Sequence, residues 1–216
     1  CPVTVYGDGI LNICDCQGSG KIVSTERTKG TVMLISSSQS AVGTVHLYSG
    51  TLSGAANNGL FCRTAEVKGG IFHMYGGLLT DGSDDPDNTK DAKPGYGGNV
   101  CVYKNGDRSG QFTMYGGVIR GGKSSLYGGN IYGDSNSHIA ILGGTVENGS
   151  SVRGGNLYCM GDVTLEGATI TGGVAELYRG NVYINGTVDL SKNTVTGGMA
   201  GGKPEVVRLM RNGVQL

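Results

Sequence analysis

The most constraining feature of this sequence is a block of alternating apolar residues that returns about every 25 positions. In each block the first and third residues are apolar whereas the second and fourth vary, which is typical of a β-strand buried on one face. The blocks begin at Val45, Phe72, Phe112, Ile139, Val163 and Val188, which are 27, 40, 27, 24 and 25 residues apart. A period of this length indicates a repeat architecture in which like residues stack.

Two further ladders follow the same period. The second lies beyond a short turn and comprises Leu52, Leu79, Ile119, Val146, Ile170 and Val195. The third begins with Gly-Asn and an apolar residue, and its asparagines are Asn99, Asn130, Asn156 and Asn181. Three short strands per coil predict an all-β, right-handed parallel β-helix of about seven coils. We expect residues 1–216 to form a single domain, with 1–22 as an irregular first coil and 203–216 as the last.

Composition agrees with this architecture and excludes several others. The chain has 42 glycines, four prolines and no tryptophan, so it turns often without a collagen period. Seventeen basic residues balance 17 acidic ones, which leaves no net charge to attract nucleic acid. No apolar run is long enough for a transmembrane segment. The recurring asparagines are best explained as scaffold, because inward-facing amides can bond to one another and to the bends.

The six cysteines are too sparse to be the main framework of the fold. Cys62 and Cys159 fall at inward positions and are expected to be buried apolar residues. Cys14 and Cys16 form a lone Cys-x-Cys pair, which is poor evidence for zinc because zinc requires four ligands. A disulfide to Cys1 is left open, since spacing does not assign a partner.

Residues 13–22 (ICDCQGSGKI), residues 112–117 (FTMYGG) and the Gly-Gly-Asn rungs resemble the right-handed β-helix repeat region of large surface proteins of gut Firmicutes. In fold, these regions resemble the pectate-lyase-like superfamily. The resemblance implies an adhesin-like bacterial protein, secreted or attached to the cell surface. It also implies that the chain is a fragment or mature part of a larger protein, and that its partner is a glycan or another host or cell-surface macromolecule.

The best candidate ligand-binding surface is the outer face of the first ladder. The register predicts that Tyr48, Tyr75 and Tyr115 stack there, with His46 and His73 beside them. Tyrosine combines an apolar ring with a polar edge and suits sugar rings. The alternative is that the tyrosines only stabilise neighbouring strands, each pair by about 0.2–1 kcal/mol.

Two more tyrosine rows weaken the functional interpretation of any one row. Outward positions of the third ladder carry Tyr132, Tyr158 and Tyr183, with Cys101 in the equivalent place. Three residues before the asparagines lie Tyr96, Tyr127 and Tyr178, with Arg153 in one coil. Three rows cannot all bind ligand, so most of them are expected to be structural.

An acidic insertion in the 40-residue coil is a second, weaker candidate. Asp81, Asp84, Asp85 and Asp87 could supply the oxygen ligands that calcium prefers. The insertion lacks the spacing of an EF-hand, and a solvated acidic turn is the favoured interpretation.

The alternative function is that of a polysaccharide lyase or glycoside hydrolase of the pectate-lyase-like fold. Such enzymes need clustered carboxylates with a basic group nearby. Here Glu166 and Asp189 lie on neighbouring rungs but at different outward positions, and the Asp84-Asp85 pair falls in an insertion. An ice-binding surface is disfavoured because charged residues interrupt the threonine ladders. The sequence therefore favours a non-catalytic adhesin or scaffold, without a catalytic residue or a required cofactor.

Overall fold

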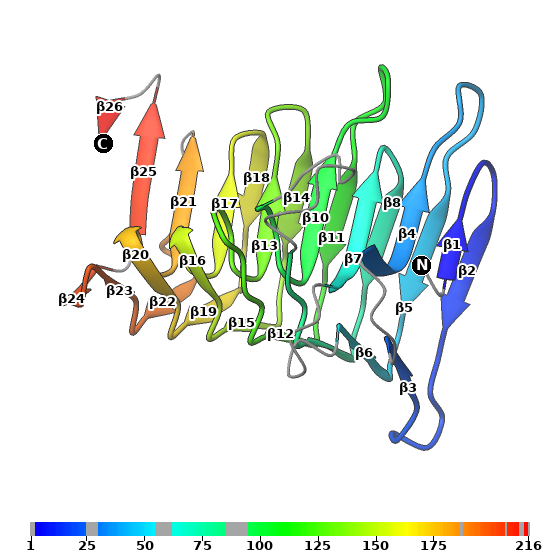
Figure 1. The fold of residues 1–216 in the computed structure, drawn as a ribbon, viewed down its shortest axis with the longest axis horizontal. Coiled ribbons are helices and arrows are strands. Elements are labelled where there is room, and N and C mark those ends of the chain that lie inside the picture. Colours follow the sequence, from blue (N-terminus) through cyan, green and yellow to red (C-terminus); the bar gives the residue numbers. More distant parts are fainter. Residues whose placement is uncertain are drawn as a thin grey trace.

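The computed structural model describes residues 3–24, 30–54, 62–84, 95–185, 188–205, 207–211 and 214–215. This part of the chain contains strands and no helix. Its coils follow one another in chain order along the long axis, from the N-terminal coil at one end to β25 at the other (Figure 1). The architecture is the predicted right-handed parallel β-helix, with seven coils.

Three parallel sheets form the sides of the solenoid, and we call them sheets A, B and C. Sheet A contains β1 (Val3–Val5), β4 (Gly30–Ser36), β7 (Cys62–Lys68), β10 (Val100–Tyr103), β13 (Ile131–Gly133), β17 (Leu157–Cys159), β21 (Val182–Asn185) and β25 (Val207–Arg211), to which β26 (Val214–Gln215) is added antiparallel. Sheet B contains β2 (Ile10–Ile13), β5 (Thr44–Leu47), β8 (Ile71–Met74), β11 (Gln111–Met114), β14 (His138–Ile141) and β18 (Asp162–Leu165). Sheet C contains β3 (Lys21–Val23), β6 (Thr51–Ser53), β9 (Leu78–Thr80), β12 (Val118–Arg120), β15 (Thr145–Glu147), β19 (Thr169–Thr171) and β22 (Thr194–Thr196).

The register of the sheets confirms the predicted ladders. In sheet B, Val45 pairs with Phe72, and Phe72 pairs with Phe112. The two phenylalanine rings lie 5.3 Å apart and are fully buried. In sheet C, each apolar residue of the second ladder pairs with its counterpart one coil on. Because a single coil cannot bury its own apolar face, this stacking creates the continuous core.

The asparagine ladder is structural, as predicted. Nδ2 of Asn99, Asn130 and Asn156 donates to Oδ1 of the next asparagine at 2.7, 2.7 and 2.8 Å. Each Nδ2 also donates to a carbonyl at the end of a sheet C strand, and each Oδ1 accepts a glycine N–H from the bend. All four asparagines are fully buried. The ladder therefore satisfies the backbone groups that the bend leaves unpaired.

The structure corrects three details of the prediction. The first coil is regular, because β1, β2 and β3 pair in register with the next coil. The block at Val188 is not a strand, although Val188 and Leu190 still pack against the core. A fourth sheet, which we call sheet D, contains β16 (Ser150–Arg153), β20 (Val174–Tyr178), β23 (Met199–Ala200) and the antiparallel β24 (Lys203–Pro204). It lies in the excursion between sheets C and A, where the sequence had predicted only a bend.

Candidate functional site

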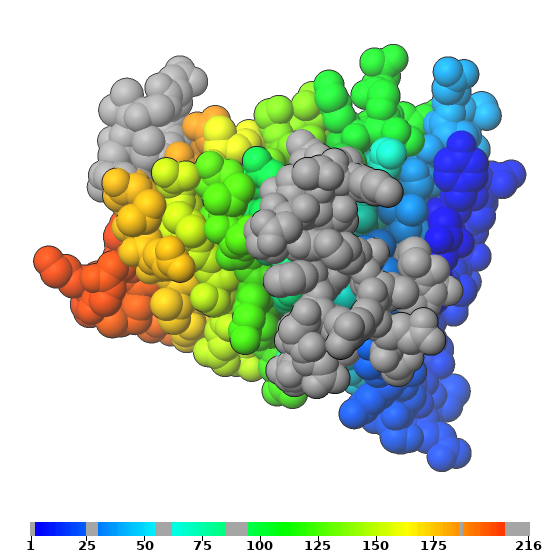
Figure 2. All heavy atoms as spheres, in the orientation of Figure 1, coloured from blue at the N-terminus to red at the C-terminus, as the bar shows by residue number. Residues whose placement is uncertain are grey.

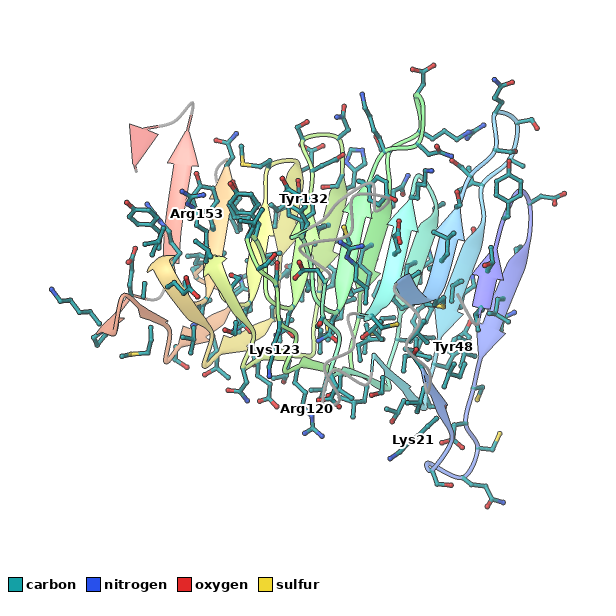
Figure 3. The ribbon with its side chains drawn as sticks, viewed as in Figure 1. Lys21, Tyr48, Arg120, Lys123, Tyr132 and Arg153 are labelled. Atoms are coloured by element: carbon teal, nitrogen blue, oxygen red, sulfur yellow. The ribbon has the colours of Figure 1, made fainter. Side chains whose placement is uncertain are left out.

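The tyrosine row, which we define as Tyr48, Tyr75 and Tyr115, lies on the outer face of sheet B. Each tyrosine directly follows a strand, and Figure 3 labels Tyr48 beyond the end of β5. Adjacent ring centroids are 4.9 Å apart, with interplanar angles of 7° and 5°. The side chains remain 47%, 40% and 45% exposed. The predicted stack is therefore present, and it faces solvent.

The rings of the row stack on one another, so their faces are occupied by neighbouring rings. Tyr75 is covered on both sides by the other two tyrosines. Partial burial in this stack, together with the two neighbouring phenols, raises the pKa of Tyr75. The row consequently presents ring edges and phenolic hydroxyls, rather than broad ring faces, to an approaching ligand.

The two histidines lie beside the row, as predicted. The rings of His46 and His73 are 5.2 Å apart with an interplanar angle of 14°, and both contact Tyr75. Nδ1 of each imidazole is buried and has no hydrogen-bond partner among the described residues. Burial, and to a smaller extent the neighbouring His46, lowers the pKa of His73. The neutral form of His73 is thus favoured, and the two imidazoles lie against the tyrosine row.

Beyond Tyr115 the same register position carries residues other than tyrosine. Leu142 follows β14 at the same register position and is 37% exposed. Glu166 comes next, and its Oε1 lies 2.6 Å from Nζ of Lys192. The outer face of sheet B therefore changes along the axis from aromatic to aliphatic to a charged pair. Lys192 could not be found from the repeat, because it lies in a turn outside the ladder.

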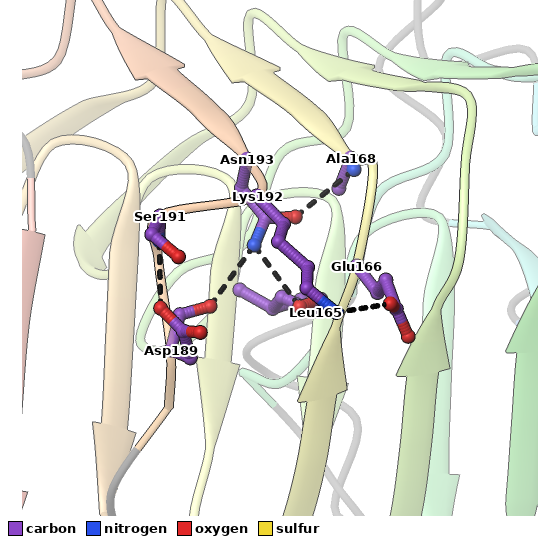
Figure 4. Close-up of polar contacts among 7 residues, drawn as sticks. All are labelled: Leu165, Glu166, Ala168, Asp189, Ser191, Lys192 and Asn193. Atoms are coloured by element: carbon purple, nitrogen blue, oxygen red, sulfur yellow. Dashed lines mark hydrogen bonds and ion pairs between the residues drawn. The ribbon is translucent and has the colours of Figure 1, made fainter.

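The carboxylates considered for catalysis have structural partners (Figure 4). Glu166 is paired with Lys192, and Asp189 accepts a hydrogen bond from the N–H of Ser191 at 2.9 Å. Hydrogen bonds from Ser191 lower the pKa of Asp189, which is opposite to the requirement for a general acid. Asn193 bridges this turn to the coil before it through the carbonyl of Leu165. A cavity of about 230 Å³ between Glu166 and Asp189 is smaller than ordinary ligand pockets, which measure about 300–1,000 Å³.

A second tyrosine set points outward from sheet A but is covered by other side chains, which the sequence did not predict. It consists of Tyr132, Tyr158 and Tyr183, with Cys101 in the equivalent place. Cys101 is fully buried and Tyr132, labelled in Figure 3, is only 6% exposed. The ring of Tyr96 packs 4.6 Å from that of Tyr132, and Tyr127 packs 4.5 Å from Tyr158. The excursion between sheets C and A folds back over sheet A and closes this second apolar cluster. The expectation that these positions face solvent is wrong for Cys101 and Tyr132.

The third tyrosine set, which lies three residues before the asparagines, has the predicted register from coil to coil. Tyr96, Tyr127 and Arg153 bridge in succession, and Arg153 pairs with Tyr178. The guanidinium of Arg153 lies 5.5 Å from the Tyr127 ring centroid and 5.8 Å from that of Tyr178. These contacts explain why arginine replaces tyrosine in one coil without interrupting the stack.

The acidic insertion is described only in part. The carboxylate of Asp84 is buried and accepts hydrogen bonds from the N–H and Oγ of Ser125, each at 2.8 Å. Asp81 adopts a positive φ of 55° at the bend. Within the described ranges no group of three or more His, Cys, Asp or Glu side chains could hold a metal ion. Asp85 and Asp87 lie outside those ranges, so the calcium site stays a prediction.

The cysteines divide by exposure. Cys62 and Cys159 are buried as predicted, and burial raises the pKa of both thiols, that of Cys159 to about 11. Cys14 and Cys16 are exposed and free on the turn after β2. A hydrogen bond between the Cys16 thiol and the Cys14 side chain raises the pKa of Cys16. Cys1, and with it the question of a disulfide, lies outside the described residues.

Comparisons with family models, with curated proteins and with solved structures find no match. The described residues also contain no helix that is long and apolar enough to cross a membrane. Any functional conclusion therefore depends on the side chains of this chain alone.

Proposed function

We propose that this chain is a non-catalytic adhesive or scaffolding solenoid of a bacterial surface protein, of the kind found in gut Firmicutes, and that it is displayed outside the cell. In this proposal the tyrosine row of sheet B contacts a cell-surface glycan. The observation that carries it is the contiguous exposure of Tyr48, Tyr75 and Tyr115 on three successive coils. Large side chains exposed in a continuous row are a common mark of an interaction surface.

The geometry of the row fits an extended polymer better than a small ligand. Its phenolic hydroxyls repeat along the solenoid axis at the 4.9 Å spacing of the rings. None of the three hydroxyls is hydrogen-bonded to another described residue, so each is free to donate and accept. A chain of sugar hydroxyls laid along the axis would meet one phenol per coil. The rigid stack loses little conformational entropy when it binds, which favours affinity.

The proposal is tested with microspheres coated with the whole chain and added to epithelial and bacterial cells. We expect Tyr75→Ala combined with Tyr115→Ala to reduce binding by about tenfold, the equivalent of about 1.4 kcal/mol. Tyr178→Ala is the matched control, because Tyr178 is also 45% exposed but lies in sheet D. It should bind as the unchanged protein does.

Equal binding by the double variant and by Tyr178→Ala would contradict the proposal. Prior treatment of the cells with glycosidases should abolish binding by the unchanged chain. If protease treatment abolishes binding and glycosidases do not, a protein receptor replaces the glycan. Release of reducing sugar from a polysaccharide incubated with the chain would instead establish the lyase or hydrolase alternative.

A further inference from the structure

A second surface of the molecule is a cleft between three turns that connect sheet A to sheet B. The turns belong to the first, second and fourth coils, and the cleft measures about 680 Å³. Its lining consists of Tyr6, Ser37, Ser38, Gln39 and residues 105–108. In Figure 2 the light-blue turn after β4 and the green turn after β10 stand above the surface with a hollow between them. The volume falls within the range of about 300–1,000 Å³ typical of small-molecule sites.

The cleft exists because the turn of the third coil is very short. Only Gly69 and Gly70 connect β7 to β8, so the longer turns on either side meet above them. Gly69 has a φ of 65°, and a Cβ atom there would lie 2.6 Å from Oγ of Ser37 and 2.8 Å from Cβ of Asn105. Any larger residue would therefore push apart the two turns that form the cleft.

Hydrogen bonds hold these two turns together. Nδ2 of Asn105 donates to the carbonyl of Ser37 at 2.7 Å. The guanidinium of Arg108 donates through Nε to the carbonyl of Ser38 at 3.1 Å and through Nη2 to that of Gln39 at 3.0 Å. The turns are thus fixed before any ligand arrives, and such preorganisation lowers the entropic cost of binding.

Tyr6 forms the aromatic wall of the cleft, and it differs from every other tyrosine of the chain. Its side chain is 62% exposed and has no ring, cation or hydrogen-bond partner among the described residues. The tyrosines of the tyrosine row, by contrast, cover one another's faces at 4.9 Å. Tyr6 therefore offers a free aromatic face, which is the element that the row lacks.

The side chains that line the cleft carry no net charge. Asp107 and Arg108 contribute one charge of each sign, and the other polar side chains are two serines, one glutamine and one asparagine. The side chains of Gln39 and Asp107 are exposed and make no bond within the described residues. Together these groups offer both donors and acceptors without a net charge.

We infer that this cleft binds a neutral saccharide, with one sugar ring stacked on Tyr6 and its hydroxyls bonded to Gln39 and Asp107. The inference shares the glycan class of the proposed function but assigns it to a separate site on the turns. A cleft without net charge favours a neutral sugar over a uronic acid or a sialylated glycan, because Asp107 would repel a carboxylate and the guanidinium of Arg108 already donates to two carbonyls.

The test is an array of neutral and acidic oligosaccharides probed with the whole chain and with four variants. We expect binding to neutral members, about tenfold weaker binding by Tyr6→Ala, and several-fold weaker binding by Asp107→Asn. The matched control is Tyr178→Ala, which is exposed in sheet D away from both proposed sites and should keep its array binding. The Tyr75→Ala, Tyr115→Ala variant is probed alongside to separate the tyrosine row from the cleft. Unchanged thermal unfolding of Tyr6→Ala would show that the loss is local.

Three results would overturn the inference: no binding to any neutral oligosaccharide, preference for the acidic members, or full binding by Tyr6→Ala. The two proposals also fail separately. If array binding is lost in the Tyr75→Ala, Tyr115→Ala variant and kept in Tyr6→Ala, the tyrosine row is the glycan site and the cleft is not. If array binding is instead lost in Tyr6→Ala and kept in the Tyr75→Ala, Tyr115→Ala variant, and this double variant also binds cells as the unchanged chain does, the cleft is the glycan site and the tyrosine row is not.

Discussion

Two groups of stacked tyrosines, on sheet B and on sheet A, have the same residue type and the same coil-to-coil register but opposite surroundings. Tyr75 in the tyrosine row is 40% exposed, whereas Tyr132 on sheet A is 6% exposed. The difference arises from a second layer, because Tyr96 and Tyr127 fold over sheet A and no comparable segment of the described chain lies over the row. A side chain that points out of a solenoid is therefore not necessarily exposed to solvent. Of these two groups, only the tyrosine row of sheet B is available to a partner.

The largest expected difference between the two groups is in stability. Tyr132→Ala should lower the free energy of unfolding by about 3 kcal/mol, because it leaves a cavity between Cys101 and Tyr96. Tyr75→Ala should lower it by about 1 kcal/mol, because it removes two exposed ring contacts. Urea denaturation of both variants measures the difference. Equal losses would mean that the two groups are buried alike.

Thiol labelling compares Cys101, which points outward from sheet A but lies under the layer of Tyr96 and Tyr127, with two cysteines on the exposed turn after β2. After reduction, Cys14 and Cys16 should react with iodoacetamide in the folded protein, since both are exposed. Cys101 should react at least roughly a hundredfold more slowly, because reagent reaches it only when the cover or the sheet opens. Peptide mass spectrometry distinguishes the sites, and the buried Cys159 serves as the internal standard. Labelling of Cys101 at the rate of Cys14 would show that sheet A is open.

The smallest expected effect is a pH dependence specific to sheet B. The pKa of His73 lies below its ordinary value of 6.5 in the folded protein, so the unfolded chain binds the proton more tightly. Stability should be constant above that value and decrease as the pH falls below it. Urea midpoints measured between about pH 7 and pH 5.5 should show this slope, and His73→Gln should reduce it. A slope that is unchanged in His73→Gln would assign the titration to other groups.

Much of the fold follows from the sequence, because stacking forces like residues into register. The alternation of apolar and variable positions along each strand predicted which side chains enter the core, as the pairing of Phe72 with Phe112 shows. The buried asparagines were identified for a related reason, since only a residue with both a donor and an acceptor can repeat inside a bend. These are contacts between equivalent positions of adjacent coils, so the period alone predicts them.

The remaining features depend on contacts between positions that are not equivalent. Alternation separates inside from outside, but it carries no information about a second layer, so the burial of Cys101 and Tyr132 was missed. The pairing of Lys192 with Glu166 joins a turn to a ladder. The cleft brings Tyr6 and Arg108 together across coils because one intervening turn is two residues long. Turn length and direction, rather than periodicity, determine these features.

Chemical nitration of the folded protein tests most directly the claim that one tyrosine group is open and the other is covered. Tetranitromethane treatment followed by peptide mass spectrometry reports every tyrosine in one experiment. The structure predicts nitration of Tyr48, Tyr75 and Tyr115 in the folded state, and nitration of Tyr132 and Tyr103 only after unfolding. Equal nitration of Tyr75 and Tyr132 in the folded protein would contradict the account.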